Sequence, residues 1–325
     1  MAKKRKIFQI FNLEFPPYIE ELKIGDYVFG RVENYPEAFD GMMCLVNSFG
    51  SEFSTQRKTG SHQITAKVEI PAKEKKSVLP WGEKRLTELD DILFLLTIFT
   101  GRNVFKKDWD DDKDIAIIQD HRLHHYGGQL HLSLSDSWVF KNISTGEIRL
   151  QAGLGSTQLF HWQKVNIGFE ESLNQVLKTL SSTEWREEYE GGYFLFLFRS
   201  AVQRQIIETS FVSCWTIWEH IFSIKNRNWL DEESIRKIGA DNRISFILSQ
   251  FFLKSIDNTA RTNIRRIVKT RNRLVHFGKK TDQVDVKEMN MFIRLTEQLL
   301  AIVLGLSPSN AFNSFEALDK FLIKT

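Results

Sequence analysis

The sequence predicts an α+β protein in which a mostly β N-terminal domain is followed by an all-α helical bundle. The first half consists mainly of short runs rich in β-branched and aromatic residues, separated by Gly, Pro, Asn and Ser. From Tyr193 onward, apolar residues instead recur with the spacing of helices. The pair Gly191-Gly192 separates the two patterns, so we expect a domain boundary there.

The strand pattern is clearest at the start of the chain, where apolar residues alternate with polar ones until Pro16-Pro17. One helix is expected in this half at 84–99, because leucines recur there at spacings of three and four and Gly101 follows. No phosphate-binding glycine fingerprint follows a predicted strand, so a nucleotide-binding doubly wound domain is not expected. Strands are predicted at 7–15, 27–32, 42–47, 64–70, 115–119, 129–134 and 157–162.

The second half predicts four or five antiparallel helices, which is the pattern of an α-bundle. Gly278 and Gly305 are natural stops for two of them. We therefore divide the chain into a mostly β sensing or regulatory domain at 1–170, a helical linker at 171–192 and an α-helical domain at 193–325. The bundle helices are predicted at 195–225, 233–253, 258–277, 284–304 and 315–322.

Composition places the protein among ordinary globular proteins, with 325 residues, 42% hydrophobic and 26% charged. Its two cysteines, Cys44 and Cys214, fall in different predicted domains within apolar runs. Buried structural thiols are therefore expected rather than a disulfide framework. The longest apolar runs are too short to span a membrane, and the basic N-terminus lacks the apolar stretch of a signal peptide. These features predict a cytoplasmic location.

The charge is unevenly distributed along the chain. Residues 1–192 hold 24 Lys and Arg against 28 Asp and Glu, a net charge of −4. Residues 193–325 hold 20 basic and 13 acidic residues, a net charge of +7. A basic C-terminal half indicates polyanionic partners, and nucleic acid above all.

The most informative segment is the predicted helix at 258–277, in which residues 261–273 hold six basic residues and no acid. At about 100° per residue, Arg271 falls within the apolar stripe of this helix. Because an unpaired buried guanidinium is costly, Arg271 needs a partner or a groove. One interpretation is a structural salt bridge, with Glu219 as the candidate partner. The other is a cleft or subunit interface that binds an anion. The stripe consists of Ile264, Ile267, Val268, Leu274 and Val275.

Two further polar residues lie at the end of this helix. Asn272 and His276 are four residues apart and so share one face. Arg271 and His276 are five apart, about 140° around an ideal helix, and are not neighbours on a regular helix. For both to act on one phosphate, the helix must end or loosen near His276, or a second copy must supply the complement.

The run Arg271-Asn-Arg-Leu-Val-His276 resembles the Arg-Asn-x-x-x-His signature of the HEPN superfamily. That family consists of α-helical domains that dimerise and, in many members, cut RNA without a metal. The resemblance covers roughly 193–325 and includes an aromatic-rich helix with Trp215 and Glu219. The layout is similar to that of ApeA-like HEPN proteins of bacterial antiphage defence, in which a mostly β domain precedes the nuclease. The Leu-rich segment that ends at 99–104 adds to this likeness.

The resemblance implies an endoribonuclease that uses the RNA's own 2′-OH as the nucleophile. His276 would transfer the proton, Arg271 would brace the phosphate oxygens, and Asn272 would orient His276 or hold an oxygen. It also implies a homodimer, RNA as the partner, no cofactor and no metal. Glu219 would play a supporting structural role. The RNA-binding candidates are Arg265, Arg266, Lys269 and Arg273.

The sequence leaves more than one interpretation of the function open. The leading one is a toxin-like or antiphage effector whose N-terminal domain senses a phage or regulatory trigger. The alternative is a non-catalytic bundle that dimerises or binds RNA or protein, with Arg271 as a structural residue. A histidine-rich stretch at 121–131 and an acidic run at 108–114 are interpreted as a solvated hairpin and a solvated loop rather than metal sites.

Overall fold

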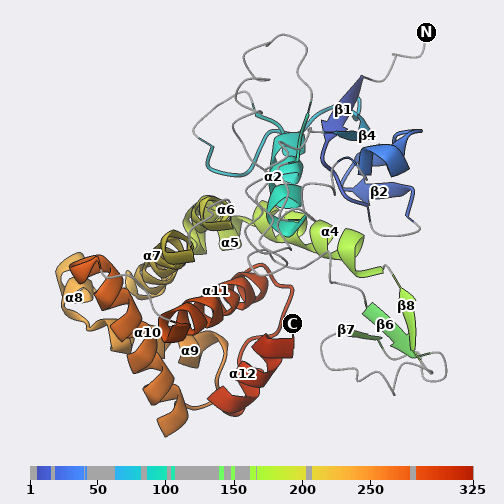
Figure 1. The fold of residues 1–325 in the computed structure, drawn as a ribbon. Helices are drawn as coiled ribbons and strands as arrows, with labels where there is room; N and C mark the ends of the chain where they lie inside the picture. Colours follow the sequence, from blue (N-terminus) through green and yellow to red (C-terminus); the bar gives the residue numbers. More distant parts are fainter. Residues whose placement is uncertain are drawn as a thin grey trace. The chain divides into compact units, whose positions relative to one another are not determined.

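The computed structural model describes the chain as two compact units. One comprises residues 1–148 and 161–178, and the other comprises 149–160 and 179–325. Element labels follow Figure 1. The described residues are 6–15, 19–39, 41, 63–81, 86–100, 104–106, 139–142, 148–150, 162–165, 167–202, 207–278 and 283–324.

A five-stranded antiparallel sheet forms the centre of the N-terminal unit, with the order β2-β3-β4-β1-β5. The strands predicted near residues 7, 27 and 64 are confirmed, each shorter than expected. β2 was not predicted, because only two apolar residues alternate within its four positions. The strands are β1 (Ile7–Phe11), β2 (Glu21–Ile24), β3 (Tyr27–Arg31), β4 (Ile64–Glu69) and β5 (Phe105–Lys106).

The helix predicted at 84–99 is α2 (Glu88–Thr100), which is apolar on nearly every side and buried. The buried carboxylate of Asp91 on this helix accepts hydrogen bonds from Ser77 Oγ (2.5 Å), the Val78 N–H (2.7 Å) and Trp81 Nε1 (2.8 Å). Three donors therefore satisfy this buried charge and hold residues 77–81 against the helix.

A second sheet has three strands in the order β7-β6-β8, formed by β6 (Val139–Asn142), β7 (Ile148–Leu150) and β8 (Trp162–Val165). β8 begins where the strand predicted at 157–162 was expected to end. The strands predicted at 42–47, 115–119 and 129–134 lie outside the described residues, as do Cys44 and both metal-site alternatives at 108–114 and 121–131.

Helix α4 (Ile167–Ser181) covers the outer edge of strand β2 with two side chains. The Lys23 N–H donates to Glu170 Oε2 (2.8 Å), and the Gly25 N–H donates to Asn174 Oδ1 (2.8 Å). Asn174 Nδ2 in turn donates to the Lys23 carbonyl (2.9 Å). Side chains thus satisfy backbone groups that an edge strand would otherwise expose to pairing with another chain.

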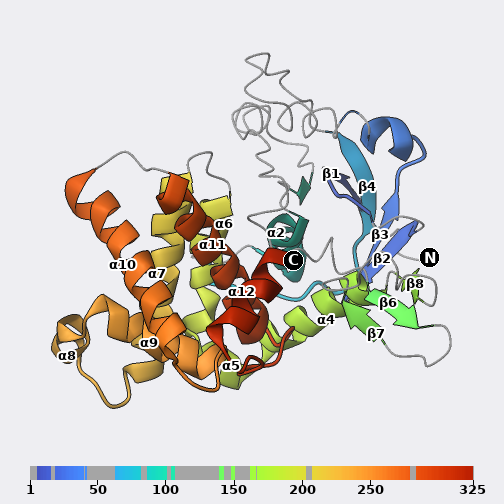
Figure 2. The ribbon, with the colours of Figure 1, turned by 60° about the horizontal axis from the view of Figure 1, so that its bottom comes forward.

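From residue 179 onward the described part of the C-terminal unit is mainly helical, and Figures 1 and 2 show its helices lying alongside one another. The predicted helices at 258–277, 284–304 and 315–322 are confirmed as α10, α11 and α12. The helices are α5 (Thr183–Glu188), α6 (Phe194–Val202), α7 (Ile207–Asn226), α8 (Glu232–Lys237), α9 (Ala240–Phe251), α10 (Asn258–Phe277), α11 (Gln283–Val303) and α12 (Phe315–Lys324).

Two predicted helices are each replaced by a pair. The helix expected at 195–225 is instead α6 and α7, which pack against each other, and Ser210 Oγ on α7 donates to the Ala201 carbonyl on α6 (2.9 Å). Apolar residues lie on both sides of the short polar run Gln203-Arg204-Gln205, so periodicity alone could not distinguish one long helix from two packed ones. The helix expected at 233–253 is α8 and α9, and Gly239, the N-cap of α9, lies between them.

The core of the bundle is an aromatic cluster between α7 and α11. The ring of Phe292 on α11 lies 5.2 Å from Phe211, 5.6 Å from Trp215 and 5.0 Å from Trp218, measured between centroids. Cys214 is buried beside this cluster, and burial raises the pKa of its thiol to about 12, so it behaves as the predicted structural thiol. The cluster fixes α7, and with it the position of Trp215.

Candidate functional site

Helix α10 has well-defined ends. The Asp257 side chain caps its first turn by accepting from the Ala260 N–H (2.7 Å). Gly278 ends it in the left-handed conformation, with φ of 53°. Ile264 and Ile267 are fully buried, which sets the rotation of the helix about its axis. The sequence motif therefore lies on the last regular turns of a helix whose rotation is fixed.

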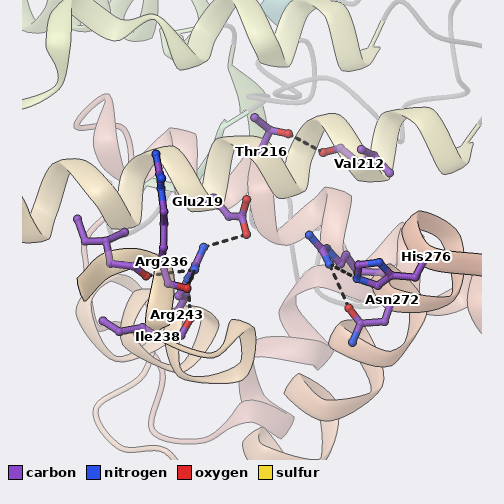
Figure 3. Close-up of polar contacts among 10 residues, drawn as sticks. Val212, Thr216, Glu219, Arg236, Ile238, Arg243, Asn272 and His276 are labelled. Carbon is purple, nitrogen blue, oxygen red and sulfur yellow. Dashed lines mark hydrogen bonds and ion pairs between the residues drawn. The ribbon is translucent and has the colours of Figure 1, made fainter. Parts of the chain in front are cut away.

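Arg271 contacts both of the other candidate catalytic residues at this end of α10. Nη1 of Arg271 donates to Asn272 Oδ1 (3.2 Å) and lies 3.1 Å from His276 Nε2. Figure 3 shows the Asn272 and His276 side chains on the same part of the helix. The contact forms within one chain while α10 stays helical through Phe277. The sequence expectation that the helix must loosen, or a second copy intervene, is thus not needed for these two side chains to meet.

The Arg271 guanidinium lies over an aromatic ring on the neighbouring helix. Its central carbon is 5.6 Å from the ring centroid of Trp215, within the range of a cation–π contact. Trp215 is only 3% exposed, and Arg271 is half-buried. Within the described part of the chain, Arg271 Nε and Trp215 Nε1 are buried without a hydrogen-bond partner. Trp215 thus belongs to the site, although sequence reasoning noted it only as a family feature.

Glu219 is paired with a different arginine from the one expected. Its Oε1 accepts from Arg243 Nη1 at 3.1 Å, as Figure 3 shows, rather than from Arg271. Arg243 also donates to the carbonyls that end α8, those of Ile235, Arg236 and Ile238. Glu219 therefore supports the corner between α8 and α9. No carboxylate pairs with Arg271 among the residues that the structure describes.

The four RNA-binding candidates on α10 fall into two groups. Arg266 forms an ion pair with Glu288 of α11 (2.6 Å), whose carboxylate is 4% exposed. Arg273 pairs with Asp285 of α11 (2.8 Å), which is 6% exposed. These two arginines hold α10 to α11. Arg265 and Lys269 are instead exposed and have no ion-pair partner among the described residues.

The surface beside the motif is apolar on the side that faces α7. Val275 on α10 is 48% exposed and Val212 on α7 is 37% exposed. Figure 3 shows Val212 and Thr216 on the stretch of α7 that runs past Asn272 and His276. These two valines are the exposed apolar side chains of this part of the described surface.

The described residues show neither a metal-binding cluster nor a membrane-spanning helix. No group of three or more His, Cys, Asp or Glu side chains lies close enough together there to hold a metal ion. None of the described helices is long and apolar enough to cross a membrane.

Comparison with known families matches residues 197–306 to the model of the Apea-like HEPN domain. The matched segment contains α7, α8, α9, α10 and α11, and therefore the whole Arg271–His276 motif. HEPN domains are often associated with ribonuclease activity. No curated protein and no solved structure matches the chain.

Proposed function

Because residues 197–306 form an Apea-like HEPN domain, we propose that the protein is a metal-independent endoribonuclease with Arg271, Asn272 and His276 as its catalytic residues. The observation that carries this proposal is the 3.1 Å contact between Arg271 and the exposed His276. An arginine without a carboxylate partner in the described structure, next to an accessible imidazole, suits a phosphodiester better than a purely structural role.

The proposed reaction is an internal transesterification. A general base takes the proton of the 2′-OH, the 2′-oxygen forms a bond to phosphorus, and the bond from phosphorus to the 5′-oxygen breaks. A general acid gives a proton to the departing 5′-oxygen. The products are a 2′,3′-cyclic phosphate and a 5′-OH end. The guanidinium of Arg271 stabilises the negative charge that builds on the phosphoryl oxygens.

The resting contact also defines how His276 works. A guanidinium can only donate hydrogen bonds, so this contact is a hydrogen bond only when Nε2 of His276 accepts and the ring proton lies on Nδ1. In this state Arg271 covers the lone pair that a general base needs. We propose that the substrate phosphate draws Arg271 towards its oxygens and so exposes Nε2 to the 2′-OH. Asn272, which accepts from the same Nη1, keeps the guanidinium near the motif.

We further propose that two copies associate through the apolar surface formed by Val212 and Val275. A two-fold axis through this surface would bring two His276 side chains to one cleft, one acting as the base and the other as the acid. In this scheme the N-terminal unit senses a trigger and controls the nuclease, in the manner of a toxin-like or antiphage effector in the cytoplasm. These roles rest on the family resemblance.

Incubation of the purified full-length protein with total RNA in EDTA tests the proposed function, with a His276→Ala variant beside it. We expect cleavage by the wild type that persists in EDTA and is absent from the variant. Cleavage that stops in EDTA would refute the metal-independent mechanism. A folded wild type that leaves RNA intact would favour a non-catalytic HEPN module.

A further inference from the structure

We infer that the solvent face of α10 is a binding track for single-stranded RNA that leads to His276 from one side of the cleaved phosphate. This inference rests on the proposed function and specifies its substrate. The track consists of Arg261, Arg265 and Lys269. Arg261 was not among the RNA-binding candidates from the sequence. Arg266 and Arg273 were among them, and they are not part of the track.

The three track residues are exposed cations that no described carboxylate pairs with. All three lie on the exposed surface, and none has an ion-pair or side-chain hydrogen-bond partner among the described residues. Arg266 and Arg273, on the same helix, are instead bound to buried carboxylates of α11. The pairing therefore separates basic residues that hold the bundle together from those that remain available to a ligand.

The track shares one face of the helix with the catalytic end. At about 100° per residue, the three cations, Asn272 and His276 fall within about 80° of one another. With a rise of about 1.5 Å per residue, Lys269 lies about 10 Å from His276 along the axis, Arg265 about 16 Å and Arg261 about 22 Å. The cations thus form one row, about 6 Å apart, that ends at the imidazole.

The electrostatic environment of the row favours a polyanion. Helix α10 contains no Asp or Glu. The two nearest acids of α11, Asp285 and Glu288, are already neutralised by Arg273 and Arg266. A phosphate chain along this face would therefore meet cations that form no ion pair with a described carboxylate, which lowers its free energy and speeds its association.

A single strand fits this row better than a duplex. One row of cations, one per helical turn, can follow the phosphates of one extended strand but faces only part of a duplex. In addition, attack by the 2′-OH requires that oxygen to line up opposite the departing 5′-oxygen. The regular A-form helix does not allow this alignment, whereas a flexible single strand does. Phosphate contacts of this kind carry no base specificity, so we expect binding that depends little on sequence.

Binding of a short, uncleavable 2′-O-methyl oligoribonucleotide to the full-length protein tests the track. Kd would be measured by fluorescence anisotropy over a range of salt concentrations. Three phosphate contacts predict a slope of log K against log salt of about −2, and each of Arg261→Gln, Arg265→Gln and Lys269→Gln should reduce its magnitude by about 0.7. Lys237→Gln, an exposed lysine on α8 with the same charge change, is the control and should leave the slope unchanged.

The same probe as a perfect duplex should bind more weakly than the single strand. Track variants that bind like the Lys237→Gln control, or a duplex that binds as well as the single strand, would overturn the inference. Because this readout does not involve cleavage, it is separate from the proposed function. RNA that binds along the track without being cut would refute the nuclease proposal alone, and His276-dependent cutting with unaffected track variants would refute the track alone.

Discussion

Replacement of Arg271 by alanine separates a catalytic arginine from a structural one, because the structure gives different magnitudes for the two roles. No carboxylate among the described residues loses its partner in Arg271→Ala, so the penalty of about 3–5 kcal/mol for breaking a buried ion pair does not arise. The variant loses the contact with Trp215, worth about 0.5–2 kcal/mol. At about 2–4 °C per kcal/mol, a loss of this size lowers Tm by only a few degrees.

The expected effect on activity is much larger. If Arg271 stabilises the charge on the phosphoryl oxygens, its removal lowers the cleavage rate by about 10²–10³-fold, which corresponds to about 2.7–4 kcal/mol of transition-state stabilisation. Single-turnover cleavage of a labelled RNA, with enzyme in excess, measures this rate without interference from product release. Arg271→Lys should restore little, because an ammonium lacks the planar fork that binds two oxygens.

Arg273→Ala is the matched control, because Arg273 lies two residues away and pairs with the buried Asp285. Its removal leaves a carboxylate that is 6% exposed without that ion pair, so Arg273→Ala should be the more destabilised variant, by up to about 3–5 kcal/mol. A folded Arg271→Ala protein with full activity would refute the catalytic role. An Arg271→Ala protein as destabilised as Arg273→Ala would show that Arg271 is structural.

Three further predictions follow from individual contacts. Diethyl pyrocarbonate should modify His276 faster in Arg271→Ala than in the wild type, and inorganic phosphate should accelerate the reaction only in the wild type. His220, which lies on α7 beside Glu190 and away from this contact, serves as the internal control in peptide mass spectrometry. Equal modification rates for His276 in both proteins would contradict the proposed cover on Nε2. Arg243→Ala should speed hydrogen exchange in 232–238, because the α8 carbonyls lose their shared donor, whereas unchanged exchange would show that α8 is held by other contacts. Burial raises the pKa of Glu288, so its charged form costs stability at neutral pH. The wild type should therefore gain stability relative to Glu288→Gln as the pH falls through this raised pKa, and denaturant titrations that show a pH-independent difference would refute the assignment.

The ends of α10 could be predicted from the sequence because local signals determine them. Asp257 is a good N-cap, Gly278 favours the left-handed conformation that stops a helix, and the apolar spacing between them is regular. By contrast, α6 and α7 were predicted as one helix. Nearly every turn there carries apolar residues. Such a pattern indicates that the residues are buried, but it does not indicate whether they belong to one helix or to two.

The site was predicted in its residues but not in its contacts. The angle between Arg271 and His276 on an ideal helix suggested that they could not meet, yet the arginine side chain is long enough to close the gap. The partner of Glu219 depends on how α9 packs against α7, and the ion pairs that occupy Arg266 and Arg273 depend on how α11 packs against α10. A pattern along one helix contains no information about these tertiary pairings.

The most direct test of the central claim is the chemistry of the RNA ends that the protein produces in EDTA. End-labelled single-stranded RNA would be incubated with the wild type and with His276→Ala, and the new ends identified by their sensitivity to phosphatase and kinase. The proposed mechanism predicts 5′-OH and 2′,3′-cyclic phosphate ends from the wild type and no new ends from the variant. Ends that carry a 5′-phosphate, or equal cleavage by His276→Ala, would contradict it.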